Sequence, residues 1–370
     1  MRVPFLDLHA AYSELQPQID AAIARVSQSG WYVLGPEVEA FEQAFAKHCG
    51  AASCVGLANG LDALHIGLLA LGIGPGDEVI VPSNTYIATW LAVTQAGATI
   101  VPVEPDPATH NLDPALIEQA ITSRTKAILP VHLYGLPADM DPICQIAQRH
   151  GLAILEDAAQ AHGARYKGRR VGSHGDLVAW SFYPSKNLGA MGDAGGLTLR
   201  HDSLTDKVRT LRNYGSARRY VNDMRGLNSR LDPMQAAVLG VKLALLETWN
   251  QRRSETARFY LEHLSQIKGL TLPIEPDWAE SAWHLFVVRH PNRDRLQKAL
   301  ADRGVETLIH YPIPPHLQQA YADLGRKQGE FPIAEQLAQE VLSLPIGPHV
   351  TTQQRQRVVE AFLEAEGAVC

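Results

Sequence analysis

From about residue 50, short β-branched runs alternate with stretches whose apolar residues recur at helical spacing. The runs are SCVGL, EVIVP, TIVPV, KAILPVHLY and GLAILED. The helical patterns between them are LDALHIGLLALG, NTYIATWLAVTQAG, DPALIEQAI and MDPICQIAQRHG. Strands that alternate with helices in this way predict an α/β fold, with a mostly parallel central sheet and helices on its faces.

A long helical stretch at about residues 232–265 interrupts this alternation. Beyond it lie a strand pattern WHLFVVR, a helix RLQKALADRG, a strand VETLI, a proline-rich loop HYPIPPH, and two closing helices around a short strand LSLPI. The pattern predicts a large domain over residues 1–245 and a smaller α+β domain over residues 246–370, with the boundary inside the long helix. A chain of 370 residues is long enough for two such cores.

Composition narrows the classes of partner. A net charge of −6 and a pI near 6.2 give no general attraction to nucleic acid or to anionic membranes. The longest apolar run falls short of the roughly 20 residues that span a bilayer, and the N-terminus lacks a secretory signal. A cytoplasmic protein is therefore expected.

Cysteine and histidine spacing gives no support for a metal site. The four cysteines, Cys49, Cys54, Cys144 and Cys370, show no C-x-x-C spacing, and the 15 histidines form no H-E-x-x-H pattern. We expect reduced structural thiols and no metal.

In parallel sheets ligands bind beyond the carboxyl ends of the strands, so the residues after each apolar run are the first candidates. Lys186 lies in the glycine-rich loop SFYPSKNLGAMGDAGG, directly after the run LVAWSF. A lysine amine can condense with a carbonyl group, and flanking glycines let a bulky ring approach the backbone. By position alone the signal is weak, because a lysine in a loop is usually a solvated surface charge.

A second candidate, Asp157, ends the run LAILED. A carboxylate at the end of a central strand is costly unless it is paired. Pyridoxal phosphate (PLP) requires such a group, because an aspartate beside the pyridine nitrogen keeps the ring protonated and electron-withdrawing. The alternative is a helix cap for the following AAQAHG turn.

Three further features are ambiguous when each is taken alone. The segment ANGLDAL, which contains Gly60, could bind phosphate at a helix start or be only a turn. The basic stretch 207–230, which includes Arg230 in NSRLD, could hold a diphosphate or be a solvated helix face and loop. His310 and Tyr311 in HYPIPPH could reach an active site or only form a turn.

Together these features supply a phosphate cradle, a pyridinium partner and an imine-forming lysine, all after strand ends of one sheet. In these features and in further segments the sequence resembles the DegT/StrS family of sugar aminotransferases over nearly the whole chain. The further segments are PFLDL, SGWYVLGPEVEAFE, GDEVIVPSNTYIAT, PVHLYG, EDAAQAHGA, LRNYGS and NSRLDPMQAA. The resemblance implies the aspartate-aminotransferase type of PLP fold (fold type I) and PLP as the cofactor.

The resemblance also implies roles around the cofactor ring. Lys186 would carry the PLP as a Schiff base and act as the catalytic proton carrier. Asp157 would hold the pyridine nitrogen. Gln160 of EDAAQ would contact the face or the phenolic oxygen of the ring, and Tyr86 of NTYIAT would stack on the other side.

For the phosphate, the resemblance implies contacts from Gly60, Leu61 and Ser181, and from Asn228 of a neighbouring subunit. A homodimer with shared active sites is therefore expected. Many members of the family have Thr or Ser where this chain has Leu61, so only the backbone N–H of Leu61 could serve here. The same resemblance indicates substrate contacts from Tyr32, Tyr183, Tyr220, Arg230, His310 and Tyr311.

Five segments of the sequence are most similar to those of enzymes that aminate the 3-keto group of dTDP-linked 6-deoxyhexoses. They are LDAL, NTYIATWLAV, RNYGS, WHLFVVR and TLIHYPIPPHLQ. The expected reaction takes an amino group from L-glutamate and gives a dTDP-3-amino-3,6-dideoxyhexose. A 4-keto substrate, a sugar dehydratase and a non-catalytic regulator of the same fold are the alternatives. Relatives that dehydrate carry histidine in place of the lysine, so Lys186 argues against dehydration. The stereochemistry and the end product, antibiotic or surface polysaccharide, stay open.

Overall fold

The computed structural model describes residues 1–369 and the side chains of residues 1–365, and it confirms the mostly parallel central sheet. The sheet has seven strands in the order β1-β9-β8-β5-β4-β2-β3. Only β9 runs antiparallel to its two neighbours, and every other neighbouring pair is parallel. The strands are β1 (Ser53–Leu57), β2 (Glu78–Pro82), β3 (Thr99–Val103), β4 (Thr125–Ile128), β5 (Ala153–Asp157), β8 (Leu177–Ser181) and β9 (Gly195–Leu199).

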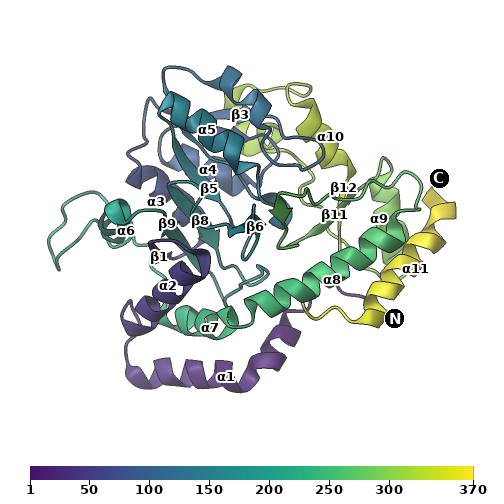
Figure 1. Cartoon of the computed structure of the whole chain (residues 1–370), viewed down its shortest axis with the longest axis horizontal. Helices are drawn as coiled ribbons and strands as arrows, with labels where there is room; N and C mark the ends of the chain where they lie inside the picture. Colours follow the sequence, from purple (N-terminus) through teal and green to yellow (C-terminus); the bar gives the residue numbers. More distant parts are fainter. Residues whose placement is uncertain (370) are drawn as a thin grey trace.

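Helices cover both faces of this sheet (Figure 1). Alternate strand residues such as Leu57 and Ala179 pack against α3 (Gly60–Ala70) and α4 (Ile87–Gln95). The residues between them, such as Cys54 and Trp180, pack against α2 (Pro36–Cys49) and α7 (Pro233–Leu243). Helix α5 (Met140–His150) covers the strands farther along that second face, and α6 (Thr205–Leu211) contacts α3 and β1. Burial on both faces explains why the strand runs read as almost continuously apolar.

The N-terminal helix α1 (Leu8–Ser29) packs on α7 through Ile19 and Val238. Its first turn is capped by Asp7, whose carboxylate accepts from the amides of His9 and Ala10. A small sheet of β6 (Arg165–Tyr166), β7 (Arg169–Arg170) and β10 (Ala279–Glu280) joins the segment after β5 to the C-terminal part of the chain.

The C-terminal part has its own hydrophobic core, in which Tyr260, Phe286 and Phe362 are fully buried. It contains α8 (Leu246–Leu264), α9 (Arg293–Asp302), α10 (Pro332–Glu340), α11 (Thr352–Val369), and the antiparallel pair β11 (Phe286–Arg289) and β12 (Val341–Leu344). The helix expected to run through residue 245 is broken there, since α7 ends at Leu243 and α8 begins at Leu246. The domain boundary at residue 245 stays a prediction.

Two predicted elements are wrong. The segment DPALIEQAI forms two short 3-10 turns, Pro114–Leu116 and Glu118–Ala120, in place of the expected α-helix. The segment VETLI forms no strand and pairs only through isolated bridges, Val3 with Val305 and Leu308 with Ser343.

Of the cysteines, Cys49 and Cys54 are buried and, with Cys144, are unpaired. Cys370 lies outside the described residues. None of the helices described is both long and apolar enough to cross a membrane.

The strand order decides where the functional residues meet. Strands β1, β8 and β5 lie close together in one half of the sheet and run in the same direction, with β9 between β1 and β8. Their carboxyl ends therefore bring the segment after Leu57, the end of β8 at Ser181 and the end of β5 at Asp157 to one edge.

Candidate active site

A cavity of about 570 Å³ lies at this carboxyl edge of the sheet. It is lined by Lys186 and by nine further residues that the sequence indicated as contacts: Gly60, Leu61, Tyr86, Asp157, Gln160, Ser181, Tyr183, His310 and Tyr311. The sheet edge and the loop after α9 supply them, so segments more than 100 residues apart in sequence share one cavity.

One end of the cavity is built to receive an anion. Helix α3 begins at Gly60, and Asn59 caps it by accepting from the amide of Asp62 at 2.8 Å. A Cβ on Gly60 would lie 2.7 Å from Cβ of Ser181, so only glycine lets the helix start approach β8 this closely. The first N–H groups of α3 and the Ser181 hydroxyl therefore lie together, and a helix N-terminus with a hydroxyl beside it suits a phosphate.

The buried carboxylate of Asp157 is only 6% exposed. The hydroxyl of Thr89 donates to its Oδ2 at 2.9 Å, and the amide of Ala159 donates to Oδ1 at 3.1 Å. Burial raises the pKa of Asp157, against these two hydrogen bonds and the positive charge of Lys186. The bond from Ala159 is the turn cap that the sequence allowed, so Asp157 caps the turn and also lines the cavity.

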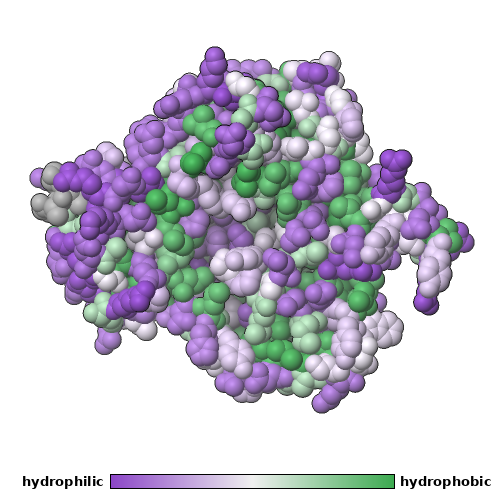
Figure 2. All heavy atoms as spheres, turned by 180° about the vertical axis from the view of Figure 1, so that it is seen from behind, coloured by the Kyte–Doolittle hydropathy of each residue, from purple (hydrophilic) through white to green (hydrophobic). Residues whose placement is uncertain are grey.

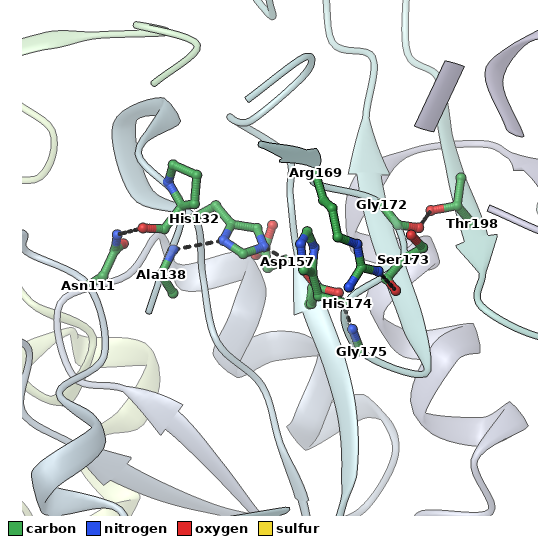
Figure 3. Close-up of polar contacts among 12 residues, drawn as sticks. Asn111, His132, Ala138, Asp157, Arg169, Gly172, Ser173, His174, Gly175 and Thr198 are labelled. Carbon is green, nitrogen blue, oxygen red and sulfur yellow. Dashed lines mark hydrogen bonds and ion pairs between the residues drawn. The ribbon is translucent and has the colours of Figure 1, made fainter. Parts of the chain in front are cut away.

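A second buried carboxylate, that of Glu156, precedes Asp157 in β5. His132 accepts at Nδ1 from the amide of Ala138 at 3.0 Å (Figure 3), so its proton is on Nε2. This Nε2 donates to Glu156 at 2.8 Å. The backbone amide of His132 also donates to the carbonyl of Asp157 at 3.0 Å. Burial raises the pKa of Glu156, but the bonds from His132 and from the amide of Gly175 bring it below its usual range.

Lys186 is half-buried at the floor of the cavity, and its loop is held on both sides. The amide of Lys186 donates to the carbonyl of Tyr183 at 2.8 Å. The side chain of Asn187 donates to the carbonyl of Ala282 at 2.7 Å and to Asn250 at 2.9 Å. Burial lowers the pKa of Lys186 to about 8, against the opposite charge of Asp157. A useful fraction of this amine is therefore neutral near pH 7.

Another part of the cavity lining is a group of aromatic side chains and an amide that contact one another. Gln160 accepts from the amide of Tyr134 at 2.6 Å and donates to the hydroxyl of Tyr311 at 3.1 Å. The ring of Tyr311 lies 5.0 Å from that of Tyr86, between centroids. Burial lowers the pKa of His310 to about 4, so its ring is neutral near pH 7 and cannot serve as a cationic acid.

Four predicted site residues lie away from this cavity in the single chain. Tyr32 is 59% exposed and Tyr220 is 85% exposed. Asn228 is bridged to Asn213, and Arg230 donates to the side chain of Asn213 at 3.0 Å. Tyr220 and Asn228 belong to a loop, residues 213–228, which projects from the body beside α6 (Figures 1 and 2); we call this loop the arm. The predicted roles of these four residues stay predictions.

Three residues at or beside the cavity were not predicted from the sequence: Thr89, His284 and Asp193. Thr89 contacts Asp157 from the first turn of α4, three residues after the NTY motif, and a polar residue facing inward from an apolar helix was the available signal. His284 and Asp193 line the cavity. His284 is bonded to Asn187 at 3.1 Å, and burial holds its pKa well below the usual range. No pattern in the sequence singles these two residues out.

The residues present fit PLP. The helix start at Gly60 lies close to Ser181, where a phosphate could bind. The buried carboxylate of Asp157 could pair with a cationic ring nitrogen, and the amine of Lys186 has a lowered pKa. The three features match the three groups through which PLP is held: its phosphate, its ring nitrogen and its aldehyde.

Comparison with known proteins gives the same identification. The sequence model of the DegT/DnrJ/EryC1/StrS aminotransferase family matches residues 13–363. A crystal structure of DesV from S. venezuelae in complex with a ketimine intermediate superposes with a TM-score of 0.97 and 55% identity, covering 99% of this chain and 98% of that one.

Three curated relatives cover nearly the full length. The erythromycin biosynthesis sensory transduction protein EryC1 of Saccharopolyspora erythraea is 59% identical over 97% of this chain and 98% of its own. The dTDP-3-amino-3,4,6-trideoxy-α-D-glucose transaminase of Streptomyces venezuelae is 56% identical, over 98% and 96%. The dTDP-3-amino-3,6-dideoxy-α-D-galactopyranose transaminase of Aneurinibacillus thermoaerophilus is 53% identical, over 97% and 98%.

Proposed function

Because this chain belongs to the DegT/DnrJ/EryC1/StrS aminotransferase family, we propose that it moves an amino group from L-glutamate to the 3-keto group of a dTDP-linked 3-keto-6-deoxyhexose. The product would be a dTDP-3-amino-3,6-dideoxyhexose. The observation that carries the proposal is that Lys186, Asp157 and the Gly60–Ser181 cradle line one cavity. The names of two relatives supply the sugar class, since both are transaminases of dTDP-3-amino deoxyhexoses.

The chain is a PLP-dependent aminotransferase, and its own residues would hold the cofactor at three points. The amides of Gly60 and Leu61 at the start of α3 and the hydroxyl of Ser181 would hold the phosphate. The carboxylate of Asp157, kept in place by Thr89, would pair with the ring nitrogen. When bound, PLP supplies an aldehyde carbon that carries the amino group and a ring that withdraws electrons.

Lys186 would take the proton from the α-carbon of glutamate as general base, and would then deliver it as general acid to the carbon of the cofactor's aldehyde group. Its lowered pKa of about 8 suits both roles, because the neutral and protonated amines are both accessible near pH 7. Tyr86 would lie over the face of the ring, and Gln160 would contact the ring from the side held by Tyr134 and Tyr311.

For the sugar, the side chains at the cavity are Tyr183, His310 and Tyr311. Burial raises the pKa of Tyr311 far above neutrality, so its phenol stays protonated. Since Tyr311 already accepts from Gln160, its own proton is free to be donated to a sugar oxygen.

We infer that a second copy of the chain completes the site. The arm carries exposed aromatic and apolar side chains, Tyr214, Tyr220 and Met224, and ends at Asn228. Exposed apolar groups on a projecting loop favour burial against another chain. In a homodimer the partner's arm would bring Asn228 to the phosphate and Tyr220 to the diphosphate of the nucleotide. Arg230, which follows the arm, would also meet the diphosphate, and Tyr32 would lie at the same contact.

A regulator without turnover is the second candidate, because one relative is named a sensory transduction protein. The complete set of Lys186, Asp157 and Ser181 favours catalysis, since a pure binding protein needs no amine of lowered pKa. A regulator would bind PLP and leave glutamate unchanged.

The absorbance of the PLP-loaded protein before and after glutamate separates these candidates. An aminotransferase converts its bound cofactor from the aldehyde to the amine form and releases one 2-oxoglutarate per site. The Lys186→Ala variant should fail in this half-reaction, whereas Lys207→Ala, a lysine on α6 outside the cavity, should retain it. A wild-type protein with unchanged cofactor after glutamate would refute the proposal.

A further inference from the structure

Behind the loop that carries Lys186 lies a second cavity, of about 400 Å³. Its walls are the N-terminal segment up to Tyr12, the back of the loop from Pro184 to Met191, the facing sides of α7 and α8, and the segment Pro348–His349. We call it the rear chamber. Lys186 lines both the rear chamber and the cofactor cavity, so a ligand here would lie next to the catalytic amine. Figure 1 shows α1, α7 and α8 converging at this side of the molecule.

Two buried cations line the rear chamber without an acidic partner. Lys242 of α7 is 8% exposed, and its ammonium donates to the carbonyl of Gly189 at 2.6 Å. Arg253 of α8 is 3% exposed and donates from Nη1 to three backbone carbonyls, of Trp283, His284 and Ile346. Among the described residues no ion pair joins Lys242 or Arg253 to a carboxylate, and Nε of Arg253 is buried without a hydrogen-bond partner.

The acidic groups nearby are already engaged. Glu14 of α1 accepts from Arg252 at both oxygens, and also from Trp249 and His349. Asp7 is exposed, and it accepts from the first amides of α1. Burying two cations that interact only with carbonyl groups is costly, and an anion in the chamber would offset that cost.

Burial has measurable consequences for both cations. It lowers the pKa of Lys242 to about 8 and that of Arg253 to about 10. An anionic ligand would reverse these shifts, because an opposite charge favours the protonated forms.

We propose that the rear chamber is a binding site for a small carboxylate, held by Lys242 and Arg253 next to Lys186. The carboxylate could come from the side chain of the amino donor or from a free carboxylic acid in the cell. The site itself stands on the chamber and its cations, and only the first of these sources rests on the proposed function.

Succinate is the probe, titrated calorimetrically into the PLP-loaded protein. We expect saturable binding that weakens roughly tenfold or more in Lys242→Met and is largely kept in Lys242→Arg. The matched control is Lys207→Met, since Lys207 also donates to one backbone carbonyl, that of Ala70 at 2.8 Å, but lies outside the chamber. No binding by the wild type, or equal binding by the wild type and Lys242→Met, would overturn the proposal.

Repeating the glutamate half-reaction with succinate present shows whether the bound carboxylate comes from the amino donor or from a free carboxylic acid. Competition with glutamate that disappears in Lys242→Met identifies the donor carboxylate as the occupant. Binding without competition identifies a free carboxylic acid. Because the calorimetry needs no turnover, a failure of the aminotransferase proposal would leave this test intact.

Discussion

The hydroxyl of Thr89 lies 2.9 Å from Oδ2 of Asp157 and donates a hydrogen bond to it. This bond ties the first turn of α4 to the end of β5, and Thr89 also contacts Thr85, with 2.8 Å between their hydroxyl oxygens. Burial raises the pKa of Asp157 above its usual value, and the hydrogen bond from Thr89 opposes that shift because it stabilises the charged form.

Replacing Thr89 by valine should therefore weaken cofactor binding. The change removes a bond to a charged group, which contributes about 1.5–3 kcal/mol, so PLP affinity should fall roughly tenfold to a hundredfold. The measurement is a spectral titration of the apoprotein with PLP. Thr94→Val on the same helix is the control, since Thr94 bonds Trp90 and Tyr321 away from the cavity. Equal losses in both variants would contradict a specific role.

Gly60→Ala should impair phosphate binding through geometry alone. The new Cβ would lie 2.7 Å from Cβ of Ser181, so β8 and α3 would have to separate. We expect PLP affinity to fall at least about tenfold and stability to fall by about 1–3 kcal/mol. Gly240→Ala in α7, where a Cβ meets nothing within 4 Å, should leave affinity unchanged and raise stability slightly. Thermal unfolding and PLP titration measure both effects.

The rate at which the apoprotein captures PLP should depend on pH through Lys186. Only the neutral amine attacks the aldehyde, and burial lowers the pKa of Lys186 to about 8. The rate of capture should rise with pH up to about 8 and then level off. The same reaction with a free acetylated lysine amide is the reference for an ordinary solvated amine. In Asp157→Asn the midpoint should move lower, because the Asp157 charge raises the lysine pKa. A rate still rising at pH 10 would show an ordinary solvated lysine.

The proposed sharing of active sites between subunits predicts complementation between two inactive variants. Lys186→Ala removes the amine, and Asn228→Asp places a negative charge where the partner's phosphate is expected. Each variant alone should be nearly inactive, whereas mixed dimers have one intact site. A refolded equal mixture should recover about a quarter of wild-type activity, since half of random dimers are mixed. No recovery in a mixture shown to exchange subunits would place Asn228 outside the partner's site.

The sheet and much of the site could be predicted because their signals are local in sequence. A strand buried on both faces reads as an apolar run, and the residue that follows it, Gly60 or Asp157, lies at the carboxyl edge wherever the strand falls in the sheet. The strand order itself, with β9 antiparallel between β1 and β8, depends on long-range packing that no single segment carries.

The wrong strand prediction and the residues that were not predicted share one cause, which is that the contacts involved join residues far apart in sequence. The segment VETLI has strand composition, but its neighbours in space are the N-terminal residue Val3 and Ser343, each of which makes only one bridge. Thr89 and His284 were missed because their roles arise from contacts with Asp157 and Asn187, far away in sequence. Tyr220 and Asn228 could be indicated only by resemblance, because a single chain leaves the arm exposed.

The central claim, amination of a keto sugar at carbon 3, is tested by giving the PLP-loaded protein ¹⁵N-labelled glutamate and a dTDP-linked 3-keto-6-deoxyhexose. Mass spectrometry and ¹⁵N-correlated NMR then locate the label. We expect a dTDP-amino sugar with ¹⁵N on carbon 3, formed in step with 2-oxoglutarate and absent in Lys186→Ala. A protein that aminates only a 4-keto sugar supplied in its place, with the label on carbon 4, would contradict amination at carbon 3. A deoxygenated product without nitrogen would contradict it as well.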